Sequence, residues 1–181
     1  MNFSDSISAT QPDAQWPPLD KRLLGAAAAK LVAASIGDSA IVMSRSPAHK
    51  HFSLADIEWM ILPPVLTGQF YVAEMAHEET GFHVPIALAT FAFVSEDVDH
   101  RLQSDLSRAP RLRPDEWQSG EIGWIIDLAG DPRGISAALE WLKAGPFKAR
   151  SAKLILRDGA GARVETLAGL MVASTPGEVA R

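Results

Sequence analysis

The amino-acid sequence predicts an α+β or mixed α/β sandwich in a single domain, with a central, mostly antiparallel sheet flanked by helices. The length of 181 residues suits one domain, and the hydrophobic share of 47% is enough for a sizeable core. The apolar pattern predicts helix, helix, strand, strand, helix, strand, helix, strand, strand, an order typical of such sandwiches. We expect the folded domain at residues 20–174, with a flexible arm at 1–19 and a frayed end at 175–181.

The first predicted helix begins after Asp20, a plausible N-cap, and runs through an alanine-rich segment until Gly37 stops it. Its most apolar stretch, Leu23–Ile36, contains Lys30 and is too short to span a bilayer, which needs ~20 residues. Residues 1–16 lack the basic and apolar segments of a secretory signal. We therefore expect no transmembrane segment and a cytoplasmic protein.

The second helix is expected over residues 53–66, with Ser53 as its cap and a break or kink at Pro63-Pro64. A β-hairpin follows, with strands at 70–76 and 84–94 around a turn at 78–81. The later elements are a short helix built on Val98, Leu102 and Leu106, a central strand at 122–128, a helix at 135–143, and a second hairpin with strands at 153–157 and 163–167.

Charge and composition exclude several classes of function. The net charge of −5 argues against nonspecific binding to nucleic acid or anionic membranes, because both favour a basic surface. The absence of cysteine excludes a disulfide scaffold, a thiolate nucleophile and a zinc site built on sulfur. His49 and His51 could offer two metal ligands, but no other ligand cluster lies at a supporting spacing. We therefore predict no metal site and no permanently bound cofactor.

Two short segments carry the residues expected to do chemistry. Ser46-Pro47-Ala48-His49 places an imidazole in a turn, and Trp124-Ile125-Ile126-Asp127 ends an apolar run with a single carboxylate. A histidine on a loop and an aspartate at the end of a buried strand are parts from which a general-base site can be built. Because a buried carboxylate is costly without a partner, a function for Asp127 is favoured over a simple helix cap. No Gly-x-Ser-x-Gly elbow is present, which argues against a serine hydrolase.

In order and spacing, these segments resemble those of the toxin-activating lysine acyltransferases, which mature RTX-type protoxins. The resemblance covers roughly residues 31–167 and includes Ile61-Leu62-Pro63, Gly68-Gln69-Phe70-Tyr71, Pro85-Ile86-Ala87 and Trp117-Gln118-Ser119-Gly120. It implies a GNAT-like fold and a homodimer. It also implies transfer of a fatty acyl group from acyl carrier protein to internal lysines of an RTX-type protoxin. The family's catalytic histidine and aspartate fall on His49 and Asp127, and a serine that affects activity falls on Ser46.

The chemistry of lysine acylation suits these residue types. A lysine amine has a reference pKa of ~10.4, so the enzyme must remove a proton before the nitrogen can attack a thioester. Histidine, with a reference pKa of ~6.5, can accept this proton and release it again. Asp127 would orient the imidazole of His49 or contact the incoming ammonium, and the sequence leaves both roles open. We expect Ser46 to position the histidine and not to act as a nucleophile.

The turn Gly130–Gly134 joins the predicted central strand to a helix. A helix N-terminus there could hold the phosphate of the carrier protein's phosphopantetheine, with Gly130, Arg133 and Gly134 as binding residues. A plain strand-to-helix turn explains the same residues equally well. The turn lacks the fuller glycine pattern of acetyl-CoA-binding GNAT enzymes, which agrees with an acyl-carrier donor.

Two other functions stay open, namely a GNAT-like acetyltransferase that uses acetyl-CoA and a non-catalytic module that escorts a secreted protein. A single general base supplies only ~10²- to 10⁴-fold of rate, so a protein lysine must also be positioned by a larger surface. The candidates for that surface, or for a dimer contact, are Trp59, Phe70 and Tyr71.

Overall fold

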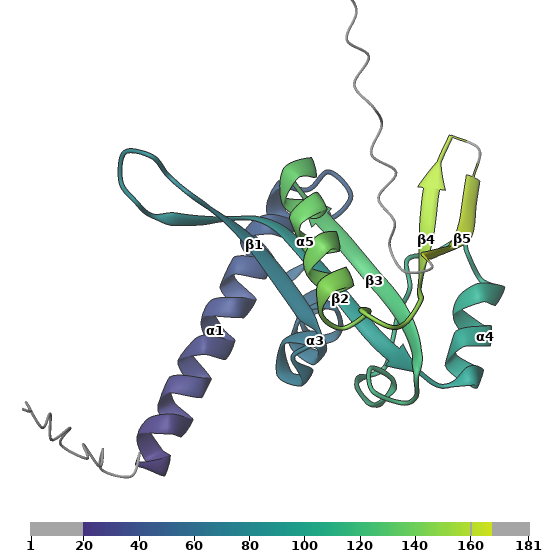
Figure 1. The fold of residues 1–181 in the computed structure, drawn as a ribbon, viewed down its shortest axis with the longest axis horizontal. Helices are drawn as coiled ribbons and strands as arrows, with labels where there is room; N and C mark the ends of the chain where they lie inside the picture. Colours follow the sequence, from purple (N-terminus) through teal and green to yellow (C-terminus); the bar gives the residue numbers. More distant parts are fainter. Residues whose placement is uncertain (1–19, 160, 168–181) are drawn as a thin grey trace, which may run out of the picture.

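The computed structural model describes residues 20–159 and 161–167, so the predicted arm at 1–19 and the predicted end at 175–181 lie outside the described residues. The described chain forms one five-stranded sheet in the order β1-β2-β3-β4-β5 (Figure 1). All neighbouring strands are antiparallel except β3 and β4, which are parallel. This is the predicted α+β architecture with a mostly antiparallel sheet. The strands are β1 Phe70–Ala76, β2 His83–Val94, β3 Ile122–Gly130, β4 Ala152–Asp158 and β5 Gly161–Leu167.

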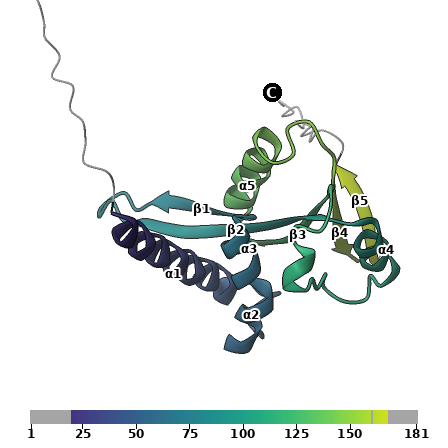
Figure 2. The ribbon, with the colours of Figure 1, turned by 90° about the horizontal axis from the view of Figure 1, so that it is seen from below.

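Helices cover both faces of the sheet. Seen along the sheet edge, α5 lies on one side, whereas α1, α2 and α3 lie on the other (Figure 2). The helix α4 lies beside β4 and β5 (Figure 1). The helices are α1 Lys21–Arg45, α2 Ile57–Met60, α3 Leu62–Thr67, α4 Glu96–Ser104 and α5 Pro132–Ala144, with short 3₁₀ turns at Leu54–Asp56 and Pro114–Glu116.

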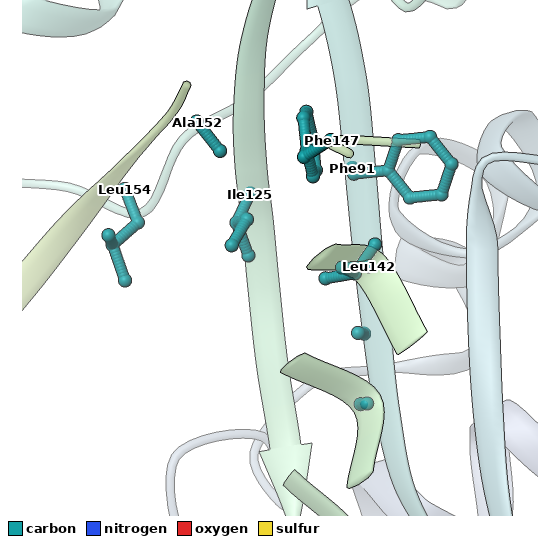
Figure 3. Close-up of a cluster of buried hydrophobic side chains, with 8 residues drawn as sticks. Phe91, Ile125, Leu142, Phe147, Ala152 and Leu154 are labelled. Carbon is teal, nitrogen blue, oxygen red and sulfur yellow. The ribbon is translucent and has the colours of Figure 1, made fainter. Parts of the chain in front are cut away.

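The strand β2 is buried on both of its faces, which explains its nearly continuous apolar sequence. Alternate side chains on a strand point to opposite faces. Phe91 therefore packs with Ile125 and Leu142 in a cluster beneath α5 (Figure 3). Leu88 faces the other way and packs against Val42 and Met43 of α1. The middle of the sheet is thus the centre of the core.

The prediction that Gly37 ends the first helix is wrong, because α1 continues to Arg45. Asp20 does cap it, and its carboxylate accepts a hydrogen bond of 2.8 Å from the backbone N–H of Arg22. A helical glycine costs about 1 kcal/mol relative to alanine. Burial of Val42 and Met43 against the sheet outweighs that cost, since each buried side chain contributes roughly 1.5–3 kcal/mol.

The greater length of α1 also removes the argument that the first helix is too short to span a bilayer. With 25 residues and a mean hydropathy of 1.5 in its most apolar window, α1 is long and apolar enough to cross a membrane. Core helices of soluble proteins and signal sequences can have the same length and hydropathy. The C-terminal part of α1 packs on the sheet, whereas Leu23, Leu24 and Leu31 near its start are exposed.

The single helix predicted over residues 53–66 is instead a 3₁₀ turn followed by α2 and α3, with the break at Ile61. Pro63 and Pro64 stand in the first turn of α3, where a missing backbone N–H leaves no acceptor unpaired. The predicted turn at residues 130–134 is also shorter than expected, because α5 already begins at Pro132. Leu106 falls beyond the end of α4.

Candidate active site

His49 and Asp127 lie side by side in the folded protein. The imidazole Nε2 of His49 is 2.7 Å from Oδ2 of Asp127, and its Nδ1 is 2.8 Å from the hydroxyl oxygen of Ser46. His49 is 9% exposed and Asp127 is 25% exposed, so the contact is shielded on the histidine side and partly open on the carboxylate side. The three predicted catalytic residues form one hydrogen-bonded row.

The end of α1 holds His49 in place. Ser46 is the C-cap residue, and its backbone N–H donates to the carbonyl of Met43. The carbonyl of Ser46 in turn accepts from the backbone N–H groups of His49 and Lys50, which closes a tight turn. Pro47 has no backbone N–H, so this position of the turn leaves no donor without an acceptor. The turn brings the side chains of Ser46 and His49 together and directs the imidazole toward the sheet.

A β-bulge places Asp127 on the face that His49 approaches. Thr90 of β2 pairs with Asp127 of β3, but the next pair along β2 joins Phe91 to Ile125, so Ile126 is an extra residue. In a regular strand, residues 125 and 127 would point to the same face. The extra residue allows Ile125 to enter the core beneath α5 while Asp127 faces the opposite side. Because of the bulge, Ile125 and Asp127 lie on opposite faces of the sheet although they are only two residues apart.

A cavity of about 550 Å³ adjoins this pair. His49, Asp127 and Thr90 contribute to its wall, and the larger part of the wall is apolar, including Leu128 and Leu154. The cavity lies where β3 and β4 part, since these parallel strands pair only at Gly123 with Ala152 and at Trp124 with Lys153. Figure 1 shows β4 leaving β3 beyond this point. An extended apolar group would fit between the separated strands.

Aromatic residues border the cavity next to His49. The ring of Phe52 lies 5.8 Å from the imidazole and 6.1 Å from the Trp59 ring. The guanidinium carbon of Arg111 lies 4.6 Å from the centre of the Trp59 ring, within the range of a cation–π contact. The indole N–H of Trp59 donates to Asp56, and this hydrogen bond is the main cause that lowers the pKa of Asp56. Trp59, a candidate for a substrate-positioning surface or for a dimer contact, thus lies beside the candidate site.

The predicted phosphate-binding residues are not part of this cavity wall. Gly130 and Gly134 pack so tightly on β2 that an added Cβ would lie 2.2 Å from the Ile86 carbonyl oxygen and 2.6 Å from the Ala87 Cβ, respectively. Asp131 caps α5 by accepting from the backbone N–H of Arg133, and Oδ1 of Asp131 also lies 3.2 Å from the Arg133 Nε. The hydrogen bond from the Arg133 side chain is the main cause that lowers the pKa of Asp131. Phosphate binding at this turn stays a prediction.

Some residues of the cavity wall were missed by the sequence interpretation. Thr90, Trp117 and Arg157 all contribute to the wall. For Thr90 a signal was present, because it is the only hydroxyl-bearing residue within the apolar run 84–94. Trp117 and Arg157 carried no local signal that they would lie beside His49. Within residues 20–159 and 161–167, no three histidine, aspartate or glutamate side chains are grouped so that they could hold a metal ion.

The fold and the site together define a class of protein. A histidine paired with a carboxylate can accept and return a proton, and the adjoining apolar cavity suits an apolar substrate group. The chain belongs to the RTX toxin acyltransferase family, whose sequence model matches residues 29–168.

Two curated relatives agree with this family. The chain is 33% identical over 93 residues to the lysine-acyltransferase RtxC of Vibrio cholerae serotype O1, which is 51% of this chain and 56% of the relative. It is 29% identical over 92 residues to the leukotoxin-activating lysine-acyltransferase LktC of Pasteurella haemolytica-like sp. (strain 5943B), covering 51% of this chain and 50% of the relative. The chain thus matches about half the length of each relative.

Proposed function

We propose that this protein is a lysine acyltransferase that moves a fatty acyl group from acyl carrier protein to internal lysines of an RTX-type protoxin. The observation that carries the proposal is the 2.7 Å contact between His49 and Asp127 at the wall of an apolar cavity. Membership of the RTX toxin acyltransferase family supports the reaction and the class of protein substrate. The names of the two relatives, both lysine-acyltransferases, agree with the choice of amino acid.

In the proposed reaction, His49 acts as the general base. The lysine ammonium first releases one proton to solvent, and the resulting amine takes the place of the Asp127 carboxylate at Nε2 of His49. The amine then gives a second proton to Nε2 as its nitrogen attacks the carbonyl carbon of the acyl thioester. The tetrahedral intermediate then breaks its carbon–sulfur bond, and the imidazolium returns the proton to the departing thiolate. The products are an amide and a free thiol, and the histidine ends in its starting state.

Asp127 serves both the imidazole and the incoming ammonium. Its Oδ2 contacts His49, whereas its Oδ1 has no hydrogen-bond partner in the part of the chain that the structure describes. An ammonium group placed at Oδ1 would therefore lie next to Nε2 of His49. The negative charge of Asp127 also stabilises the imidazolium that forms when the proton moves. Both roles considered for Asp127 are compatible with this geometry.

Ser46 and Asp127 together determine which nitrogen of His49 carries the proton, because each contacts one ring nitrogen. A hydroxyl can donate to an unprotonated Nδ1 or accept from a protonated one. In the free protein, the contact with the Asp127 carboxylate requires Nε2–H, so the Ser46 hydroxyl donates to Nδ1. When the lysine amine replaces the carboxylate at Nε2, Ser46 can accept from Nδ1–H and leave the lone pair of Nε2 free to act as the base. Ser46 itself is buried and is not among the residues of the cavity wall, which favours positioning over nucleophilic attack.

The cavity between β3 and β4 is the proposed site of the acyl chain. Its apolar wall residues include Ile125, Leu128, Leu154 and Ile155. Each buried methylene of a fatty chain would contribute about 0.8 kcal/mol to binding. A chain held there would present its thioester to His49 and Asp127 in the cavity wall.

We further propose a cytoplasmic homodimer. The exposed leucines of α1, at 69%, 48% and 69% for Leu23, Leu24 and Leu31, offer an apolar surface that a second copy would cover. The same surface argues against a free monomer in solution, since large exposed apolar side chains favour association. Light scattering of the wild type and of a Leu31→Glu variant tests this point, and a monomeric wild type would contradict it.

The central experiment is an acylation assay with purified protein and a candidate protoxin encoded beside its gene. Acyl-acyl carrier protein or acetyl-CoA is supplied as donor, and modified lysines are located by mass spectrometry. The proposal expects fatty acylation of internal lysines from acyl carrier protein alone. Acetylation from acetyl-CoA would favour a GNAT-like acetyltransferase, and tight protoxin binding without any acylation would favour a non-catalytic escort.

A further inference from the structure

Thr90 carries a buried hydroxyl group that the fold does not use. The residue is 2% exposed and lies in the middle of β2 between Ala89 and Phe91. Its Oγ1 has no hydrogen-bond partner in the part of the chain that the structure describes. Burial of an unpaired hydroxyl lowers the stability of a protein, whereas valine at such a position would fill the same space without that penalty. An unpaired hydroxyl kept at this position therefore points to a use outside folding.

The position of Thr90 indicates what that use is. Thr90 and Asp127 are directly paired across β2 and β3, so their side chains share one face of the sheet. Opposite residues in an antiparallel pair have Cβ atoms roughly 4.5–5.5 Å apart. Thr90 also contributes to the wall of the cavity beside His49. The hydroxyl thus lies next to the proposed proton-transfer pair.

Two other buried polar atoms without a partner in the described residues lie nearby but differ from Thr90. They are Oε1 of Gln69 and Nε1 of Trp117. These two residues are already linked, because the Gln69 amide donates to the Trp117 carbonyl at 2.9 Å. Of the three residues, Thr90 is the one paired with Asp127 across the sheet. Of these three residues, Thr90 alone combines an unpaired polar atom, a position in the cavity wall and pairing with Asp127 across the sheet.

We infer that Thr90 is a catalytic residue whose hydroxyl donates a hydrogen bond to the carbonyl oxygen of the acyl thioester. The inference rests on the proposed acyltransferase function. When the lysine nitrogen attacks, the carbonyl π electrons move to oxygen, and the resulting oxyanion needs a donor. Asp127 cannot fill this role, because its carboxylate is an acceptor with a negative charge. Thr90 keeps its proton throughout, and the oxygen reverts to a carbonyl when the carbon–sulfur bond breaks.

The test compares Thr90→Val with Thr90→Ser and the wild type. Valine preserves the shape and removes the hydroxyl, so kcat should fall roughly 10²- to 10³-fold while KM for the acyl carrier protein stays within about threefold. Serine keeps the donor and should retain kcat within about tenfold. The melting temperature of Thr90→Val should equal or exceed that of the wild type, because no hydrogen bond of the free protein is lost.

Thr67→Val is the matched control. The Thr67 hydroxyl donates to the Pro63 carbonyl at 2.8 Å, and Thr67 is not among the residues of the cavity wall. This control should lower the melting temperature and leave kcat unchanged. Thr90→Val should lower kcat but not the melting temperature, whereas Thr67→Val should lower the melting temperature but not kcat. This contrast distinguishes a hydroxyl kept for catalysis from one kept for folding.

Several outcomes would overturn the inference. A Thr90→Val enzyme with kcat within threefold of the wild type would do so, and so would equal losses in Thr90→Val and Thr90→Ser. If Thr90→Val fails to fold, Thr90→Ala replaces it, with the same expected loss of kcat. A wild-type protein that transfers no acyl group from any donor would refute the proposed function instead, and the comparison of melting temperatures would still report on the unpaired hydroxyl.

Discussion

The Nε2 atom of His49 lies 2.7 Å from Oδ2 of Asp127, although 78 residues separate the two along the chain. Two local structural features bring them together. The C-cap turn at Ser46 directs His49 back toward the sheet, and the bulge at Ile126 turns Asp127 to the face that α1 covers. Each feature spans only a few residues, but the contact between His49 and Asp127 depends on the packing of α1 against β2 and β3.

Replacement of His49 by glutamine should reduce acylation roughly 10²- to 10⁴-fold, because glutamine can form hydrogen bonds but cannot accept the lysine proton. Mass spectrometry of the protoxin after timed reactions measures the loss. His51→Gln is the matched control, since His51 is exposed and two residues away. Equal activity of His49→Gln and the wild type would remove His49 from the mechanism.

Loss of the Ser46 hydroxyl should have a smaller effect. Ser46→Ala removes one hydrogen bond to Nδ1 of His49, so kcat should fall about fivefold, in line with about 1 kcal/mol for such a bond. Ser44→Ala serves as a control, because the Ser44 hydroxyl donates to the Ile41 carbonyl within α1 and Ser44 is not among the residues of the cavity wall. If Ser46→Ala were as inactive as the histidine variant, Ser46 would be a nucleophile and not a positioning residue.

Reversal of the charge at Arg133 tests the predicted phosphate site at the start of α5. An Arg133→Glu variant should raise KM for acyl-acyl carrier protein severalfold if Arg133 contacts the donor's phosphate. Arg150→Glu is a control with another arginine that pairs with a carboxylate, in this case Glu121. An unchanged KM in Arg133→Glu would leave Gly130, Arg133 and Gly134 with a structural role only.

Lys153 should contribute strongly to stability. Its ammonium lies 2.8 Å from the carboxylate of Asp99, which is only 6% exposed and also accepts from the Trp124 indole at 2.8 Å. Lys153→Met would leave that buried charge without its cation and should cost about 3 kcal/mol in the free energy of unfolding. Urea titration measures this value. Lys143→Met, which breaks a surface pair with Glu140, should cost under about 0.5 kcal/mol, and equal losses would contradict the prediction.

Asp131 should make the stability of α5 depend on pH. The Arg133 side chain, and then its backbone N–H, lower the pKa of Asp131 from the value of 3.8 that is normal for the unfolded chain. A lowered folded-state pKa gives stability that is present above pH 3.8 and is lost as the pH falls through the folded value. Asp131→Ala should therefore lower the melting temperature at pH 7 and change it much less at pH 2. An equal decrease at both pH values would contradict this assignment.

Several elements follow from the sequence alone because their signals are local. The strands at 70–76 and 84–94 are observed at Phe70–Ala76 and His83–Val94, and the central strand and second hairpin also lie where predicted. Apolar alternation and turn residues act over a few positions, so these elements need no distant partner to be recognised. The Asp20 cap is confirmed for the same reason.

The tertiary structure decided what depends on contacts between distant segments. Gly37 is a plausible local stop, but packing of Val42 and Met43 on the sheet extends α1 to Arg45. The bulge at Ile126 appears only when β3 is paired with β2, because a bulge is a shift in the register between two strands.

The same division holds for the candidate site. Family resemblance in the sequence pointed to Ser46, His49 and Asp127, but only the fold brings His49 and Asp127 within hydrogen-bond distance. The parting of β3 from β4 creates the cavity and places Thr90 in its wall. A cavity is a property of packing among several elements, and no single stretch of sequence encodes its shape.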